Sequence, residues 1–173
     1  DMSELQTVAR NDRIEIHSLI EEVLTDLEPL AQEKKVELIQ KSQGAGEKAD
    51  EELFLTGSDI LRYSMLYNHV ENAHKYNRTD GTVTVSAKRE KNEVVLTVSD
   101  TGNGIDEAFR EQIFEPFFRI DKSRSRELGG VGLGLAMVRE VVRVHDGTIK
   151  VYTNEHGGTT FKVCGLAEYR DNE

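Results

Sequence analysis

The sequence has little of several features that would each place it in a particular class of protein. Its 173 residues include one cysteine, Cys164, which excludes an internal disulfide framework and suits a reducing compartment. No apolar run approaches the roughly 20 residues that span a bilayer, and the first four residues, Asp-Met-Ser-Glu, are not a signal peptide. We therefore expect a cytoplasmic chain that makes no direct membrane contact.

Positive charge is also scarce. Lys and Arg number 22 against 32 Asp and Glu, which gives a formal net charge of -10. Proteins that follow a nucleic-acid backbone collect Lys and Arg on one face, so the composition argues against nucleic acid as a partner. Any polyanion must be met by a local basic cluster, and one lies at Arg119–Arg126.

Hydrophobic spacing predicts an alternation of helices and hairpins in one domain. Helices are expected over 18–30 (after a capping box of Ser18 and Glu21), 58–76, 106–112 and 135–145, and strands over 14–16, 36–39, 82–87, 94–98, 148–152 and 159–164. The chain lacks the regular strand-helix-strand rhythm of a parallel sheet. The predicted fold class is therefore α+β, an α/β sandwich with helices packed on one side of a mixed sheet.

The helix over 58–76 carries polar side chains on one face. Asn68, Asn72 and Lys75 are spaced four and three residues apart, so they project together from the side opposite the apolar stripe. Amide oxygens can coordinate Mg²⁺ and an ammonium group can neutralise phosphate. A solvated helix face is the competing interpretation, and for this helix taken alone it is the favoured one.

The segment Asp100–Ile105 directly follows a predicted strand. A carboxylate at a strand end can accept a hydrogen bond from an exocyclic amine, and Gly102 and Gly104 permit close approach of a flat ring. The segment is therefore a candidate adenine site. An ordinary turn is the alternative, because Asp, Asn and Gly are common in turns.

The segment Gly129–Leu135 contains four glycines and leads into a helix. Free backbone N–H groups and the helix dipole favour an anion there, so phosphate is the expected ligand. A dinucleotide fingerprint is disfavoured because no parallel strand precedes the glycines, and no Gly-Lys-Ser or Gly-Lys-Thr motif of a phosphate loop occurs.

Between the two glycine segments, Phe114–Arg119 is followed by Lys122, Arg124 and Arg126. An aromatic anchor before a basic, glycine-ended stretch favours a lid that closes over phosphates. A solvated charge run, with aromatics that serve only the core, is the alternative. Further along, Gly157–Phe161 by itself indicates only a hairpin turn.

Taken in order, five segments resemble the asparagine, first glycine, phenylalanine, second glycine and third glycine boxes of histidine kinases: Asn68–Tyr76, Asp100–Ile105, Phe114–Arg119, Gly130–Leu135 and Gly157–Phe161. The resemblance covers about residues 13–165. It implies the Bergerat ATP-binding fold of gyrase, Hsp90 and MutL, with ATP and Mg²⁺ as cofactors. The implied activity is that of a protein-histidine kinase of a two-component system.

The resemblance also implies roles for individual residues. Asn68, Asn72, Lys75 and Arg119 would be catalytic, with Asn72 as the Mg²⁺ ligand and Arg119 contacting phosphates from the lid. Asp100 would receive the adenine amino group. The nucleotide would further be bound by Tyr76, Gly102, Gly104, Ile105, Phe117, Gly130, Val131, Gly132, Leu133, Gly134, Leu135 and Thr160.

Asn68 distinguishes between relatives. Hydrolysing members have a glutamate there that activates water, and an amide cannot act as a general base at neutral pH, so phosphotransfer is favoured over hydrolysis. An ATP hydrolase, a serine kinase acting on a protein partner and an interaction module that binds no nucleotide remain alternatives.

In this family, an acidic residue and a Thr-Pro pair follow the phosphoacceptor histidine. None of the five histidines of this sequence has that setting: they are His17, His69, His74, His145 and His156. We expect His69 and His74 to be buried, hydrogen-bonded neutral imidazoles. Residues 1–12 would end an upstream dimerisation helix, 13–167 would form the catalytic domain and 168–173 a tail. The expected partners are a histidine-containing dimerisation domain and a response regulator, within a membrane-bound sensor kinase.

Overall fold

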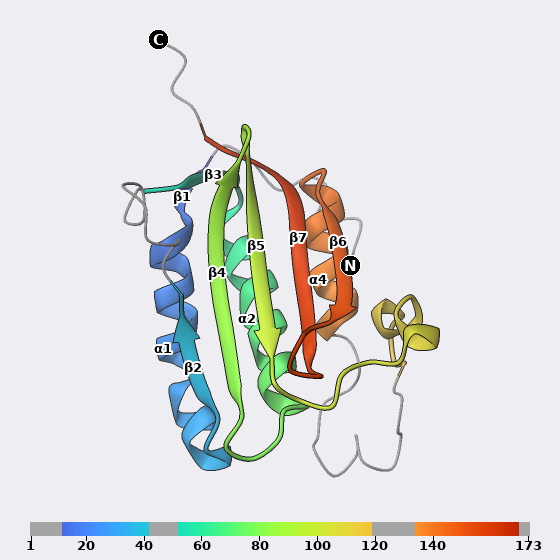
Figure 1. Ribbon diagram of the computed structural model, residues 1–173. Helices are drawn as coiled ribbons and strands as arrows, with labels where there is room; N and C mark the ends of the chain where they lie inside the picture. The colour runs from blue at the N-terminus through green and yellow to red at the C-terminus, as the bar shows by residue number, and fades with distance from the viewer. Residues whose placement is uncertain (1–11, 42–51, 119–133, 170–173) are drawn as a thin grey trace.

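The computed structural model describes residues 12–41, 52–118 and 134–169 (Figure 1). In chain order the elements are β1 (Asp12–Glu15), α1 (Ile16–Lys34), β2 (Glu37–Gln40), β3 (Phe54–Gly57), α2 (Asp59–Lys75), β4 (Thr82–Glu90), β5 (Glu93–Asp100), the 3₁₀ turns η2 (Glu107–Phe109) and η3 (Gln112–Phe114), α4 (Gly134–Val144), β6 (Thr148–Thr153) and β7 (Thr159–Ala167). Two short 3₁₀ turns therefore replace the single helix expected over 106–112.

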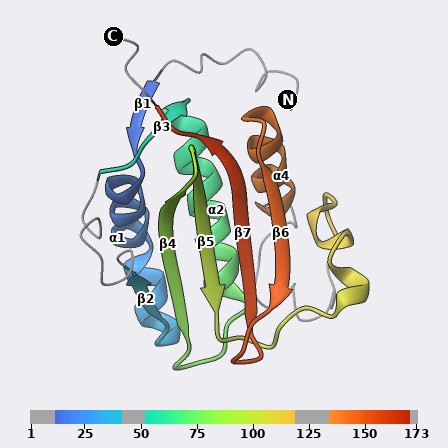
Figure 2. The same cartoon turned by 45° about the horizontal axis from the view of Figure 1, so that its top comes forward.

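The main sheet has five strands in the order β2-β4-β5-β7-β6. The pair β2–β4 is parallel and the other neighbouring pairs are antiparallel, so the sheet is mixed. Figures 1 and 2 show α1, α2 and α4 together on one face of this sheet. This arrangement confirms the predicted α+β sandwich of helices on one side of a mixed sheet.

The core lies between the sheet and these helices. Alternate residues of the central strands point into it, as the period of two in the sequence predicts, and they meet the apolar stripes of the helices. Burial of each such aliphatic side chain contributes about 1.5–3 kcal/mol. Fully buried examples are Ile20, Val23, Leu66, Val70, Val83, Val85, Leu96, Val98, Val138, Val141 and Val163.

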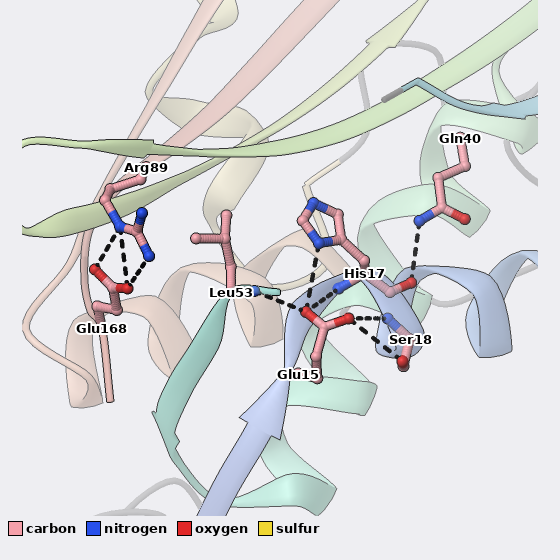
Figure 3. A network of polar contacts seen from close by, with 7 residues as sticks. All are labelled: Glu15, His17, Ser18, Gln40, Leu53, Arg89 and Glu168. Carbon is pink, nitrogen blue, oxygen red and sulfur yellow. Dashed lines mark hydrogen bonds and ion pairs between the residues drawn. The ribbon is translucent and has the colours of Figure 1, made fainter. Parts of the chain in front are cut away.

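The start of α1 differs from the prediction. The helix begins at Ile16, before the expected capping box of Ser18 and Glu21, and Glu15 is its N-cap. The Glu15 carboxylate accepts hydrogen bonds from the backbone N–H of His17 (3.1 Å), Ser18 (3.2 Å) and Leu53 (3.1 Å) (Figure 3). The capping-box prediction is wrong because one carboxylate caps α1 and also holds the chain that leads into β3.

One corner of the molecule joins β1, β3 and the end of β7. The β1 and β3 strands pair antiparallel, and the Arg13 guanidinium lies 3.7 Å from the Phe54 ring centroid and 5.6 Å from that of Tyr169. The Tyr169 N–H donates to the Phe54 carbonyl at 2.7 Å. Arg89 forms an ion pair with Glu168, whose side chain is 8% exposed (Figure 3).

Candidate nucleotide-binding site

The α2 helix presents the first group of expected site residues. It begins after Ser58, whose hydroxyl oxygen accepts a hydrogen bond from the Leu61 N–H (3.3 Å), and it ends at Lys75 with Tyr76 as its C-cap, close to the predicted bounds of 58–76. At its C-terminal end the Lys34 ammonium donates to the carbonyls of Lys75 (2.6 Å) and His74 (3.3 Å). A cation at this end satisfies carbonyl groups that the helix leaves without partners.

Asn68 is oriented by its own helix. Its Nδ2 donates to the Ser64 carbonyl oxygen at 2.7 Å and lies 3.3 Å from the Ser64 hydroxyl. Its Oδ1 lies 3.6 Å from the position that a Cβ would take on Gly134, the first residue of α4. The acceptor end of Asn68 therefore faces the start of α4, where the sequence predicts phosphate.

Asn72 and Lys75 lie further along the same helix and are both partly exposed. The Asn72 side chain makes no hydrogen bond to the described residues, so its amide oxygen is available to a ligand. The Lys75 Nζ lies 5.5 Å from the ring centroid of Tyr76, which is itself exposed. These three side chains are therefore accessible at the C-terminal end of α2.

Asp100 is the last residue of β5, and only one of its two carboxylate oxygens is held by hydrogen bonds. Its Oδ1 accepts hydrogen bonds from the N–H groups of Gly102 (2.9 Å) and Thr159 (3.0 Å). Its Oδ2 has no hydrogen-bond partner among the described residues. Burial raises the pKa of Asp100, although these two hydrogen bonds act in the opposite direction. One carboxylate oxygen is thus held in place while the other can accept a bond from a ligand.

Close backbone approaches at Gly102 and Gly158 bring three segments together at Asp100. A Cβ on Gly102 would lie 2.9 Å from the Tyr76 carbonyl oxygen, and one on Gly158 would lie 2.1 Å from the Asp100 carbonyl oxygen. Only residues without a Cβ allow these distances. The end of α2, the end of β5 and the start of β7 therefore meet at the candidate adenine site.

A small aromatic cluster lies beside this site. Ile113, Phe114 and Phe161 form its buried part, and Ile105 and Leu135 pack against it. Phe114 is buried, which fits both an aromatic anchor for a lid and an aromatic that serves only the core. Phe117, in contrast, is 67% exposed at a positive φ of 67°. Gly104 lies next to the β6–β7 turn, because a Cβ there would be 2.7 Å from the Gly157 carbonyl oxygen.

The remaining expected residues fall into two groups. Arg119, Gly130, Val131, Gly132 and Leu133 lie outside the described residues. Thr160 is buried, with its Oγ1 at 2.8 Å from the Ser99 Oγ and at 3.3 Å from the Asn154 Nδ2. The Thr160 hydroxyl therefore links β7 to Ser99 of β5 and to Asn154 of the β6–β7 turn.

Asn77 and Asn154 were not singled out from the sequence, yet both form part of the site's framework. Asn77 is buried; its Nδ2 donates to the Thr82 carbonyl oxygen (2.8 Å) and its Oδ1 accepts from the Thr101 hydroxyl (3.3 Å). Asn154 contacts Asp100 and Thr160. Asn is common in turns, so neither residue gave a signal that distinguishes it from a turn residue.

The two histidines of α2 have different surroundings. His69 is fully buried with its ring edge-on to Phe161 at a centroid distance of 4.9 Å, and burial lowers its pKa to about 3. Neither ring nitrogen of His69 has a hydrogen-bond partner among the described residues. The expected burial and neutrality are confirmed, and the expected hydrogen bond is wrong. His74 is half-buried, its Nε2 lies 3.0 Å from the Leu30 carbonyl oxygen, and burial lowers its pKa.

Acid should destabilise the fold through His69. Because its folded pKa of about 3 lies below the ordinary 6.5, the unfolded chain takes up this proton first, and stability falls as pH decreases from about 6.5. At pH 5 the loss is about 2 kcal/mol. We expect His69→Leu to reduce by about that amount the difference in unfolding free energy between pH 8 and pH 5, measured with urea. The exposed His156→Gln is the control, and an unchanged pH dependence in His69→Leu would contradict the prediction.

No helix in residues 12–41, 52–118 and 134–169 is long and apolar enough to cross a membrane. Within the same ranges, no group of three or more His, Cys, Asp or Glu side chains could hold a metal ion.

With this geometry in place, comparison with known proteins identifies the family. The model of the histidine kinase-, DNA gyrase B-, and HSP90-like ATPases matches residues 58–168, from the N-cap of α2 to the ion-paired Glu168. The chain belongs to this family. Within it, relatives of similar sequence include sensor histidine kinases.

Relatives of known sequence are longer sensor proteins. The sensor-like histidine kinase SenX3 of Mycobacterium tuberculosis is 38% identical over 148 residues, which cover 79% of this chain and 36% of SenX3. The sensor protein IrlS of Burkholderia pseudomallei is 32% identical over 163 residues, which cover 89% of this chain and 33% of IrlS. The chain thus spans about a third of the length of these relatives.

Solved structures confirm the ATPase fold. The catalytic domain of the histidine kinase ThkA superposes with a TM-score of 0.76 at 23% identity, covering 90% of this chain and 95% of that domain. Full-length ShkA in complex with AMPPNP gives a TM-score of 0.77 at 23% identity, covering 98% of this chain and 35% of ShkA. ThkA in complex with the response regulator TrrA gives 0.73 at 21% identity, covering 91% of this chain and 42% of that chain.

Proposed function

We propose that this chain binds Mg-ATP at the Asp100 end of the sheet and transfers the γ-phosphoryl group to a histidine on a separate dimerisation domain. The observation that carries the proposal is the Asp100 carboxylate, whose Oδ1 is fixed by two backbone N–H groups while Oδ2 remains available. An adenine amino group is a suitable donor to that oxygen. The AMPPNP complex of ShkA supports a nucleotide as the ligand.

The α2 helix supplies the groups for the triphosphate and its cation. Asn72 offers an unengaged amide oxygen, and the Asn68 Oδ1 faces the first residue of α4. Mg²⁺ binds oxygen ligands and neutralises charge on the phosphates, so these residues fit it, with Asn72 as the direct ligand. Lys75 would neutralise phosphate oxygens, and Arg119 and the Gly130–Leu135 segment would complete the phosphate site.

Phosphotransfer is favoured over hydrolysis by the chemistry of Asn68. Its Nδ2 is committed to Ser64, and a carboxamide cannot remove a proton from water at neutral pH. Among the histidines, His69 and His145 are buried and so cannot reach a phosphoryl group at the surface. His17, His74 and His156 lack the acidic residue and Thr-Pro pair that follow the family's phosphoacceptor, so we assign the acceptor histidine to another domain. The transfer then depends on positioning and charge neutralisation.

The proposal extends to the parent protein. Residues 13–167 would form the catalytic domain, and Glu168 and Tyr169 would belong to it as well, because Glu168 pairs with Arg89 and the Tyr169 N–H donates to the Phe54 carbonyl. The complex of ThkA with TrrA supports a response regulator as the downstream partner. We place the chain on the cytoplasmic side of a membrane-bound sensor kinase.

Calorimetry with ATP, with and without Mg²⁺, tests the binding step. We expect heat release and a raised melting temperature with Mg-ATP, and a clear loss of affinity when EDTA removes the metal. Incubation with radiolabelled ATP and a histidine-bearing dimerisation domain of a SenX3-like kinase should then give an acid-labile phosphoprotein. Folded protein that binds no nucleotide would disprove the proposal, and steady phosphate release by the chain alone would identify a hydrolase.

A further inference from the structure

The turn between β6 and β7 is held against Asp100 by one side chain. The Asn154 Nδ2 donates to the Asp100 carbonyl oxygen at 2.9 Å and to the Thr160 Oγ1 at 3.3 Å. The Asn154 Oδ1 accepts from the N–H groups of His156 and Gly158, both at 3.0 Å. A carboxamide has two N–H donors and two acceptor lone pairs, so its hydrogen-bonding capacity is used in full.

These contacts determine where the Asp100 carboxylate points. Asn154 fixes the backbone of Asp100 through the carbonyl, and it fixes the turn that leads to Thr159. The Thr159 N–H then donates to Asp100 Oδ1 at 3.0 Å. Asn154 therefore acts on Asp100 from both sides, through the Asp100 backbone and through the donor that binds the carboxylate.

We propose that Asn154 is a positioning residue for base recognition, which holds Asp100 Oδ2 where the adenine amino group arrives. This inference rests on the proposed function, because it assumes that Asp100 binds adenine. Asn154 does not itself touch the nucleotide in this assignment. Its contribution is to adenine preference, so its loss should affect ATP more than a nucleotide that lacks the 6-amino group.

A purely local turn role would require only half of these contacts. An Asn side chain that stabilises its own turn accepts hydrogen bonds from N–H groups a few residues ahead, as Oδ1 does here. The Nδ2 contact to Asp100 instead joins residues 54 positions apart in sequence. Asn154→Asp separates the two roles, because it retains the acceptor for the turn and removes the donor to Asp100 and Thr160.

The test compares ATP with inosine triphosphate, which has an oxo group in place of the amino group. Both carry the same triphosphate, so the ratio of their affinities reports on the base alone. For Asn154→Asp and Asn154→Ala we expect ATP affinity to fall about tenfold and inosine triphosphate affinity to change less than about twofold. Glu155→Ala is the matched control, since that side chain lies in the same turn and is 86% exposed.

Each outcome decides the question. An unchanged preference for ATP in folded Asn154→Asp would overturn the inference while leaving the proposed function intact. Equal losses for both nucleotides would make Asn154 a structural residue, as would failure of both variants to fold by circular dichroism. If the unmodified chain binds ATP no better than inosine triphosphate, the adenine assignment of Asp100 itself fails.

Discussion

Asn72→Ala is expected to abolish Mg²⁺-dependent ATP binding and to leave the fold intact. The amide oxygen of Asn72 is the direct metal ligand in the proposed site, and its loss also leaves the triphosphate without its main link to α2. We expect affinity in the presence of Mg²⁺ to fall about 100-fold or more. Calorimetry with and without Mg²⁺ measures this change.

Stability provides the internal check on this variant. Asn72 lies within α2, and its side chain makes no hydrogen bond to the described residues, so alanine should hold or slightly raise the melting temperature because of its higher helix propensity. Glu71→Ala is the control, since it changes the neighbouring residue of the same helix. Normal Mg²⁺-dependent affinity in Asn72→Ala would rule out its role as the metal ligand.

Gly158→Ala should disrupt both the fold and the site. A Cβ at this position would lie 2.1 Å from the Asp100 carbonyl oxygen and 2.8 Å from its carbonyl carbon. Backbone atoms cannot rotate away as a flexible side chain can, so the β6–β7 turn must move from the end of β5. We expect a loss of about 3 kcal/mol in unfolding free energy and a large loss of ATP affinity, measured by urea unfolding and calorimetry.

The adjacent Gly157 offers a matched control for Gly158→Ala. A Cβ at Gly157 would meet nothing within 4 Å, and its φ of +80° lies in the region that asparagine tolerates better than most residues. Gly157→Asn should therefore cost about 1 kcal/mol or less and retain ATP binding. A Gly158→Ala variant as stable as Gly157→Asn would show that the close approach to Asp100 can be relaxed.

The long periodic elements could be predicted from the sequence because their signals are local. The α2 helix has a capping serine and an apolar stripe, and the β4–β5 hairpin alternates cleanly, so both were expected within a few residues of their observed bounds. Asp100 was found for the same reason, since a carboxylate at the end of a buried strand followed by glycines is a local pattern.

The contacts that sequence reasoning missed join residues far apart in the chain. Glu15 binds Leu53 across 38 positions, and Asn154 binds Asp100 across 54. The β3 strand has only four residues, and its pairing with β1 across the 42–51 segment stabilises it. No local pattern encodes such partners. Ser18 has the neighbours expected of an N-cap, but the Glu15 carboxylate caps α1 and also accepts a hydrogen bond from the Leu53 N–H.

The corner that joins β1, β3 and the end of β7 lies at the opposite end of β5 from Asp100 (Figure 1). Because β5 has 8 residues that each rise about 3.3 Å, Asp100 lies roughly 25 Å away, and a rotation of about 20° at the corner would move it by about 9 Å. A rigid-body rotation of the sheet about this corner would therefore displace the proposed nucleotide site much farther than it displaces Arg13.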